Sequence, residues 1–73
     1  MRVDLRLRTL LEVIPKETRI SIWGGDVRYE FDNLRQISSK FRTQYGEYIV
    51  TEISPMLDYD EEPYLSIVTD YPN

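Results

Sequence analysis

The side chains that most often perform catalysis near neutral pH are scarce in this sequence. It contains no His and no Cys, which removes the usual general bases, nucleophiles and zinc ligands. Lys16 and Lys40, the two lysines, fall at positions that we expect to be exposed, so neither has the buried setting that activates a catalytic lysine. We therefore expect a protein that is not an enzyme, uses no cofactor and acts by binding another macromolecule.

One group of carboxylates is dense enough to suggest a metal site. Asp58, Asp60, Glu61 and Glu62 follow one another closely, and oxygen ligands of this type suit calcium or magnesium. The segment lacks the glycine and the distal glutamate of a calcium-binding loop, however, and no second cluster accompanies it. We favour a solvated loop between two strands and predict no metal ion.

Gly24-Gly25 and the neighbouring Trp23 form a second noteworthy segment. A phosphate-binding loop would need further glycines or a Lys-Ser/Thr pair and would lead into a helix, whereas this segment leads into a predicted strand. A tight turn is the better interpretation. Trp23 either is partly exposed and anchors an interface or packs at the edge of the core, and the sequence supports both interpretations equally.

Elements of regular structure must position these residues, and the first half of the chain predicts three. Leucine and isoleucine at spacings of three and four predict a helix over about 4–14 that ends before Pro15. From Thr18 the apolar period changes to two, and it does so again over 27–31. Because Gly24-Gly25 supplies the positive φ angles of a tight turn, these two runs predict a β-hairpin.

The second half of the chain predicts a helix and two strands. Asp32 is expected to cap a helix over about 33–45, which ends at Gly46. Alternating β-branched runs at 48–53 and 64–69 predict two more strands, joined by a loop over 54–63. The order α-β-β-α-β-β predicts an α+β fold with a mixed or mostly antiparallel sheet and both helices on one face.

Length and composition limit the architecture further. A chain of 73 residues, 41% hydrophobic and 30% charged, has room for one core, so we expect a single domain over 1–73. No apolar run is long enough for a membrane span, and the first residues lack the layout of a signal peptide. We therefore expect a cytoplasmic protein that has no membrane partner.

The net charge of −4 conceals a strong asymmetry along the chain. All nine basic residues lie within 1–46 together with six acids, whereas 47–73 carries seven acids and no base. Phosphate repulsion by the second segment argues against direct binding of nucleic acid there. The charge distribution is therefore informative about partners rather than about the fold.

The acidic, tyrosine-rich last third is the strongest candidate for partner binding. Carboxylates along a strand pair can imitate the charge of a nucleic-acid backbone, and tyrosines add rigid contact area at low entropic cost. Alternatively, this face only keeps the protein soluble. Charge reversal of the four acids at 58–62 is expected to leave the fold intact, because loop charges contribute little to folding. The candidate partner-binding residues are Glu47, Glu52, Asp58, Tyr59, Asp60, Glu61, Glu62, Tyr64 and Trp23.

Basic residues of the first two thirds could form a patch if the helices lie side by side. Such a patch would bind nucleic acid or an RNA-loaded protein, or would pair with the acidic half of a second copy in a homodimer. Ion pairs within the monomer are the plainest explanation, and both a monomer and a homodimer stay open. The residues concerned are Arg2, Arg6, Arg8, Arg28, Arg35, Lys40 and Arg42.

The segment Leu10-Leu11-Glu12-Val13-Ile14-Pro15-Lys16-Glu17-Thr18-Arg19-Ile20-Ser21-Ile22-Trp23 resembles the small acidic proteins encoded by bacteriophages and mobile elements of Gram-positive bacteria. The resemblance covers about the first 31 residues and carries no functional motif. Proteins of this kind include phage anti-defence proteins and anti-CRISPR inhibitors, some of which fill a DNA-binding cleft as acidic mimics. The resemblance implies a host target such as a CRISPR-Cas effector, for instance the basic region through which Cas9 reads DNA. The alternative is a homo-oligomeric structural or regulatory module without such mimicry.

Overall fold

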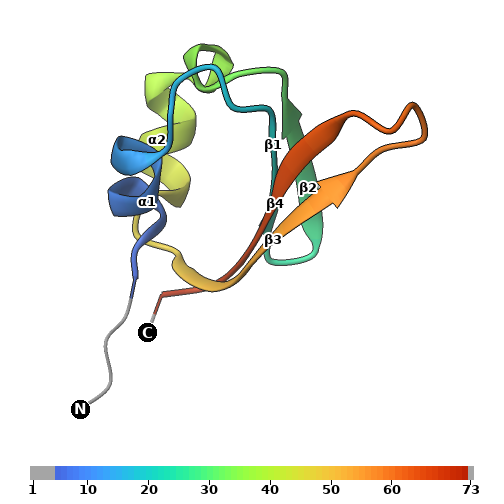
Figure 1. Ribbon diagram of the computed structural model, residues 1–73. Helices are drawn as coiled ribbons and strands as arrows, with labels where there is room; N and C mark the ends of the chain where they lie inside the picture. Colours follow the sequence, from blue (N-terminus) through green and yellow to red (C-terminus); the bar gives the residue numbers. More distant parts are fainter. Residues whose placement is uncertain (1–4, 73) are drawn as a thin grey trace.

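Residues 5–72 are described by the computed structural model, and their elements follow the predicted order (Figure 1). They form an α+β fold in which a four-stranded, mostly antiparallel sheet has both helices on one side. The elements are α1 (Leu7–Val13), β1 (Ile20–Gly24), β2 (Val27–Phe31), the 3-10 turn η1 (Leu34–Gln36), α2 (Ser39–Tyr45), β3 (Ile49–Leu57) and β4 (Pro63–Asp70). Among the residues from 5 to 72, no helix has the length and apolar character that crossing a membrane requires.

Helix α1 starts later than the sequence predicts. Arg6 is extended, with φ −83° and ψ 145°, and stands as the N-cap, while residue 4, the expected start, lies outside the described part of the chain. The backbone N–H of Leu7 donates to the Tyr48 carbonyl at 2.9 Å, and Leu5 O accepts from Val50 N at 2.8 Å. The chain before α1 therefore runs beside β3 instead of beginning the helix.

The β1–β2 hairpin is confirmed, and its two glycines have different tasks. Gly24 pairs with Val27, which leaves Gly25-Asp26 as the two-residue loop. Gly25 has φ +70°, and a positive φ at the first loop position is the signature of a type II′ turn. A Cβ on Gly24 would lie 2.9 Å from Cε1 of Tyr45. Gly24 is thus needed for close packing and only Gly25 for its φ angle.

The single helix predicted over 33–45 is wrong, because two side chains cap two separate pieces. Asn33 accepts through Oδ1 from the backbone N–H two residues on (2.9 Å), and this begins η1. Ser38 accepts through Oγ from the N–H of Phe41 (3.1 Å), and this begins α2. Ile37 between them is extended, with ψ 115°. Ser and Asn favour caps over helix interiors, so Asn33 and Ser38 replace Asp32 as the capping residues.

The order of strands in the sheet is β2-β1-β4-β3, with β1 and β4 parallel and the other pairs antiparallel. Ile20, Ile22 and Ile67 are at most 1% exposed and belong to the same core cluster as the buried residues of α1 and α2. We call their side of the sheet the covered face. Successive side chains of a strand alternate between faces, so Ser21 and Trp23 lie on the opposite side, which we call the open face.

Strand β3 ends four residues later than predicted and includes Pro55, so the connecting loop is 58–62 rather than 54–63. The backbone N–H of Asp58 donates to the carbonyl of Glu62, so this pair is hydrogen-bonded. Hydrogen-bonded and non-hydrogen-bonded pairs alternate along an antiparallel ladder. Pro55 and Leu65 form the third pair along from Asp58 and Glu62, and therefore a non-hydrogen-bonded one. The ring nitrogen of Pro55 therefore faces away from β4, which an edge strand tolerates and which also discourages a further strand from adding there.

Aromatic rings connect α2 to β2 and to the end of the chain. Tyr29 and Tyr45 share a hydrogen bond between their hydroxyls at 2.5 Å, and their ring centroids lie 5.2 Å apart. This hydrogen bond and then desolvation raise the pKa of Tyr45 to about 12, because both favour the neutral phenol. The neighbouring ring pairs, with centroids 4.6 to 5.3 Å apart, include Phe31, Phe41, Tyr48 and Tyr71.

Alkaline pH should weaken the fold through Tyr45. A tyrosine loses its proton near pH 10 in the unfolded chain but near pH 12 here. A pKa raised by folding contributes stability that is complete below the unfolded pKa and is lost as the pH rises through the folded one. Urea titrations at about pH 8 and about pH 11 should therefore show a larger loss of stability for the wild type than for Tyr45→Phe. Equal losses would contradict this assignment.

Candidate partner-binding site

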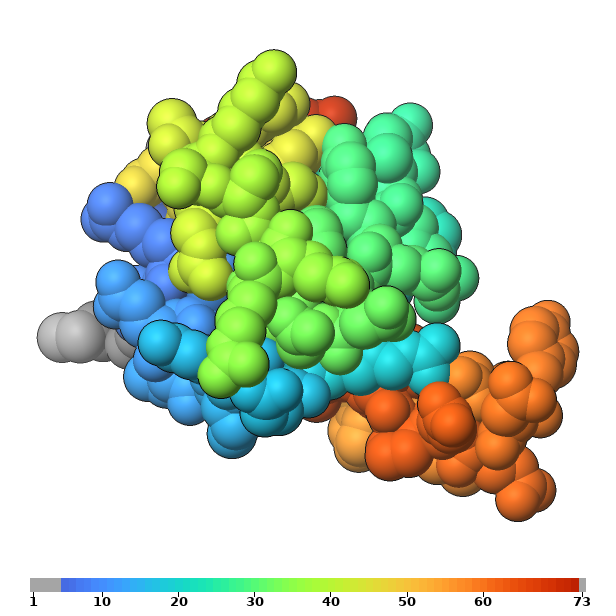
Figure 2. Space-filling model, turned by 90° about the horizontal axis from the view of Figure 1, so that it is seen from above, coloured from blue at the N-terminus to red at the C-terminus, as the bar shows by residue number. Residues whose placement is uncertain are grey.

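The connection between β3 and β4 is a five-residue loop with defined geometry. Asp58 O accepts from Glu61 N at 3.0 Å, and Asp58 N donates to Glu62 O at 3.0 Å. Glu61 has φ 60°, a left-handed conformation in which such loops usually place glycine. We call residues 58–62 the hairpin tip. It projects beyond the rest of the molecule, as the orange segment of Figure 2 shows, and Tyr59 within it is fully exposed.

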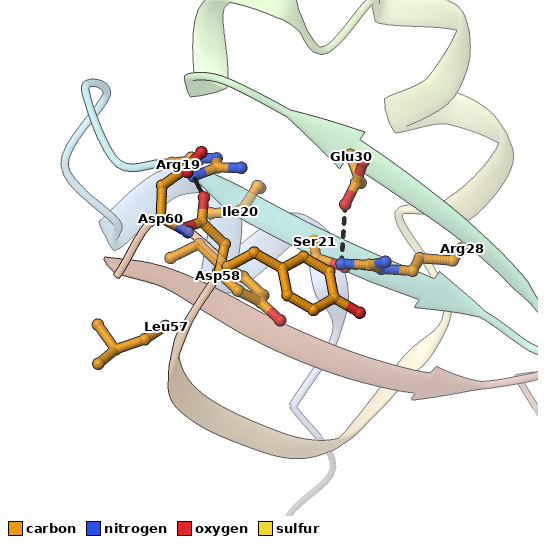
Figure 3. A pocket seen from close by; sticks show the side chains of 10 residues that line it. Arg19, Ile20, Ser21, Arg28, Glu30, Leu57, Asp58 and Asp60 are labelled. Atoms are coloured by element: carbon orange, nitrogen blue, oxygen red, sulfur yellow. Dashed lines mark hydrogen bonds and ion pairs between the residues drawn. The ribbon is translucent and has the colours of Figure 1, made fainter. Parts of the chain in front are cut away.

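Asp58 organises the tip from within. Its Oδ1 accepts from the backbone N–H groups of Asp60 (2.8 Å) and Glu62 (2.9 Å), and its Oδ2 accepts from Arg19 Nη1 at 2.5 Å (Figure 3). The Arg19 hydrogen bond, followed by the backbone donors, holds the pKa of Asp58 below its ordinary value. Asp58 is therefore a structural residue, and the expectation that charge reversal of all four tip acids spares the fold has to exclude it.

Arg19 attaches the tip to the body of the domain, a role that the sequence analysis did not assign. It stands directly before β1, and its guanidinium carbon lies 5.8 Å from the centroid of the Tyr64 ring. Cation–π stacking of this kind is favourable. Arg19 also lies 3.6 Å from a carboxylate oxygen of Glu62. The signal in the sequence was the Asp at the first position of a type I turn, but nothing local indicated which cation would reach it.

A polar groove of about 520 Å³ separates the tip from the open face of the sheet. Arg28 donates from Nε to Ser21 Oγ at 2.9 Å and pairs with Glu30 at 2.8 Å, so both its polar edges are occupied (Figure 3). Arg19 is likewise engaged by the tip. The arginines of this groove are thus neutralised by neighbouring carboxylates. Its lining therefore has no uncompensated positive charge with which to hold a small anion.

The tip leaves two carboxylates free for a partner. Asp60 and Glu61 form no ion pair with any residue between 5 and 72, and both are exposed. Glu62 is 71% exposed at its side chain and is only loosely paired with Arg19. Three of the predicted contacts, together with Tyr59, therefore present themselves to solvent on one projecting turn.

The other predicted acids do not join this group. Glu47 precedes β3 and pairs with Arg8 at 2.9 Å and with Arg6 at 3.9 Å. A nine-residue strand spans about 27 Å, so Glu47 and the tip lie at opposite ends of β3. Glu52 pairs with Val68 in the ladder and accepts from Ser54 Oγ at 3.2 Å on the open face. The acidic segment 47–71 is therefore not one continuous surface.

Trp23 lies on the open face, away from the tip. Its side chain is 37% exposed, and its ladder neighbours are Arg28 and Val68. The chain of β1 runs from Ile20, beside Arg19 and the tip, toward Gly24 at the far end. A single partner contacting both Trp23 and the hairpin tip would have to cover the length of the open face.

Most arginines of the predicted basic patch are paired within the domain. Arg35 bonds Glu17 at 2.8 Å, and Arg6, Arg8 and Arg28 have the partners given above. Lys40 and Arg42 have no ion pair among residues 5–72, and Arg2 lies outside them. Ion pairs within the monomer thus account for four residues of the patch. Each is exposed, so each contributes little to stability.

The described residues offer no site for a metal ion. Between positions 5 and 72, no three carboxylates come close enough together to hold one. Asp58 already accepts hydrogen bonds from the backbone N–H groups of Asp60 and Glu62, and the other three tip carboxylates are exposed. Their arrangement suits separate contacts with a cationic surface rather than the enclosure of a cation.

Acid should reveal the structural role of Asp58. Because folding lowers its pKa, its contribution is complete above the unfolded value of about 3.9 and is lost as the pH falls through the folded value. Asp58→Asn should therefore be less stable than the wild type at neutral pH, and the difference should shrink below about pH 4. Asp60→Asn is the matched control, expected to follow the wild type. Thermal melts across this pH range measure both, and a constant difference would contradict the role.

Comparison with known proteins provides no relative for this chain. No protein family matches it, no curated protein matches it, and no solved structure matches it. The resemblance of residues 10–23 to small phage proteins therefore stays an expectation, and the surface chemistry of the domain has to carry the assignment of function.

Proposed function

We propose that this protein binds the basic, nucleic-acid-binding surface of a host protein and blocks it with the hairpin tip. The target class that the resemblance of residues 10–23 implies is a defence enzyme, in particular a CRISPR-Cas effector. The observation that carries the proposal is the pair of free carboxylates, Asp60 and Glu61, beside the fully exposed Tyr59 on a projecting turn.

Internal hydrogen bonds hold the tip in shape before any partner arrives. Two backbone bonds close the turn, and Asp58 satisfies two further N–H groups. Ordering a loop on binding costs free energy, so a loop that is already ordered binds more tightly for the same contacts. These internal bonds engage the carboxylate of Asp58. The carboxylates of Asp60 and Glu61 stay available for arginines of the target.

Charge and shape both support a basic groove as the target. Carboxylates form bidentate pairs with arginine much as phosphates do, and a tyrosine adds apolar area with a polar end. A two-stranded hairpin is about 10 Å across, narrower than the channel that a nucleic-acid duplex needs. The tip can therefore enter such a channel without the rest of the domain following.

A homo-oligomeric interaction module is the second candidate, and it depends on Trp23. This large ring is 37% exposed on the open face, and buried tryptophans are frequent anchors of interfaces. Light scattering separates the two candidates. A monomer whose binding to a nuclease weakens with salt favours the first, and a salt-resistant dimer without such a partner favours the second.

Reversing the two free charges should abolish inhibition. We expect Asp60→Lys/Glu61→Lys to weaken displacement of labelled DNA from guide-loaded Cas9 by at least about tenfold, because each hydrogen-bonded charge pair contributes about 1.5–3 kcal/mol. The double variant keeps Asp58 and so keeps the turn. Fluorescence anisotropy with increasing inhibitor provides the measurement.

The matched control changes the same number of charges elsewhere. Glu12 and Asp26 are exposed and have no ion pair among residues 5–72, so Glu12→Lys/Asp26→Lys should displace DNA like the wild type. If the tip variant inhibits as well as this control, acidic mimicry by the tip is wrong. If the wild-type protein displaces no DNA, Cas9 is not the target.

A further inference from the structure

The covered face of the sheet is only half covered. Helices α1 and α2 have seven residues each, which corresponds to about 10 Å, whereas nine-residue β3 extends over about 27 Å. Figure 1 shows the outer part of the β3–β4 hairpin continuing past the helices. The side chains that point to this side therefore lose their cover toward the tip.

Exposure along the strands follows this geometry. Ile53 and Leu57 alternate on the covered face with Ile67 and Pro63 as ladder neighbours. In β4, Ile67 beneath the helices is fully buried, Leu65 is half-buried and Pro63 is exposed. In β3, exposure rises from 43% at Ile53 to 63% at Leu57. Val13, the last residue of α1, is 73% exposed, so apolar surface remains in water on both sides of the gap between α1 and the start of β4.

A groove of about 520 Å³ occupies this gap. It shares Arg19 and Tyr64 with the polar groove of the open face, but its lining is mainly apolar and comes from the end of α1, the following loop and the start of β4. By comparison, an enclosed apolar cavity of about 150 Å³ already accepts a benzene molecule. The lining includes Val13, Ile14, Pro15, Pro63, Tyr64 and Leu65.

Carboxylates border this groove at its outer end. Glu62 and Glu61 directly precede Pro63 in its wall, whereas Glu17 in the wall is paired with Arg35 at 2.8 Å. Arg19, the arginine of the wall, is already bonded to Asp58. An occupant of the groove consequently meets apolar surface in the centre and net negative charge at the end beside the tip.

We propose that this groove receives an amphipathic helix of the basic partner protein, with leucine-like side chains in the groove and lysines or arginines against the tip. A second copy of the chain fits poorly, because its own acidic tip would approach the first one. An added β-strand fits poorly as well, because Pro55 interrupts the donors of the β3 edge. The inference rests on the proposed function, since it names a second contact of the same partner beside the tip.

A designed peptide tests the groove without the natural target. The probe is a helix-forming Leu/Lys peptide of about 18 residues with leucines at spacings of three and four. Titrated into the ¹⁵N-labelled protein, it should shift the backbone amide signals of groove residues such as Thr18 and Leu65. A peptide with alanine in place of leucine, and one with glutamate in place of lysine, should each bind at least about tenfold more weakly.

Val13→Asn should weaken binding of the Leu/Lys peptide by at least about tenfold, because Val13 lines the groove. Its side chain is 73% exposed, so the variant is expected to fold. Val27→Asn, a change of the same type at a 48% exposed site in β2, should bind like the wild type. Unchanged affinity in the first variant, signals shifted only around Trp23, or equal binding of the alanine peptide would each overturn the proposal.

Three further outcomes complete the test, and the last two separate this inference from the proposed function. Self-association that Val13→Asn abolishes would identify a second copy as the occupant and overturn the basic helix. If the peptide binds in the groove and the wild type displaces no DNA from Cas9, the proposed inhibition of Cas9 is wrong, while the proposal of a helix-binding groove is supported. If Cas9 is inhibited but the groove variant changes neither inhibition nor peptide binding, the proposal of a helix-binding groove is wrong, and the proposed inhibition is supported.

Discussion

The bond between Arg19 and Asp58 is the contact on which the outer half of this molecule depends. It joins the residue before β1 to the start of the tip, across a sequence separation of 39 residues. Beyond the core rows of Ile20 and Ile22, no helix covers the β3–β4 hairpin, so burial contributes little to its position there. A two-stranded hairpin alone is marginally stable in water. The charge-assisted bond, with the Tyr64 ring beneath the guanidinium, supplies the attachment that packing does not.

The same arrangement divides the four tip acids into two kinds. Asp58 is committed to the backbone and to Arg19, while Asp60 and Glu61 point into solvent. Glu61 also occupies a left-handed conformation that costs a non-glycine residue about 1–2 kcal/mol. A glycine would remove that cost and also the carboxylate. Glu61 therefore places an exposed carboxylate on the tip at a backbone conformation that favours glycine.

The fold class and the first hairpin were predictable from the sequence because their signals are local. The period of two around Gly25, and the leucine spacing of α1, each act within a few residues. The broken second helix was missed because the cap of Ser38 competes with helix continuation, and apolar spacing alone does not reveal which prevails. The length of β3 was missed because Pro55 resembles a loop residue unless the strand is known to be an edge. Edge position depends on the parallel pairing of β1 with β4, which is a tertiary property.

The site was predictable in composition but not in arrangement. Counting charges along the chain suggested an acidic third and a basic remainder, yet the fold mixes them: Glu47 lies against Arg6 and Arg8, and Asp58 against Arg19. What survives of the asymmetry at the tip is the pair Asp60 and Glu61, which have no ion pair among residues 5–72. Short helices on a long hairpin leave apolar surface next to that charge, because α1 and α2 have seven residues each whereas β3 has nine extended ones. The acidic tip and the apolar groove therefore have one origin, a strand pair longer than the layer that packs on it.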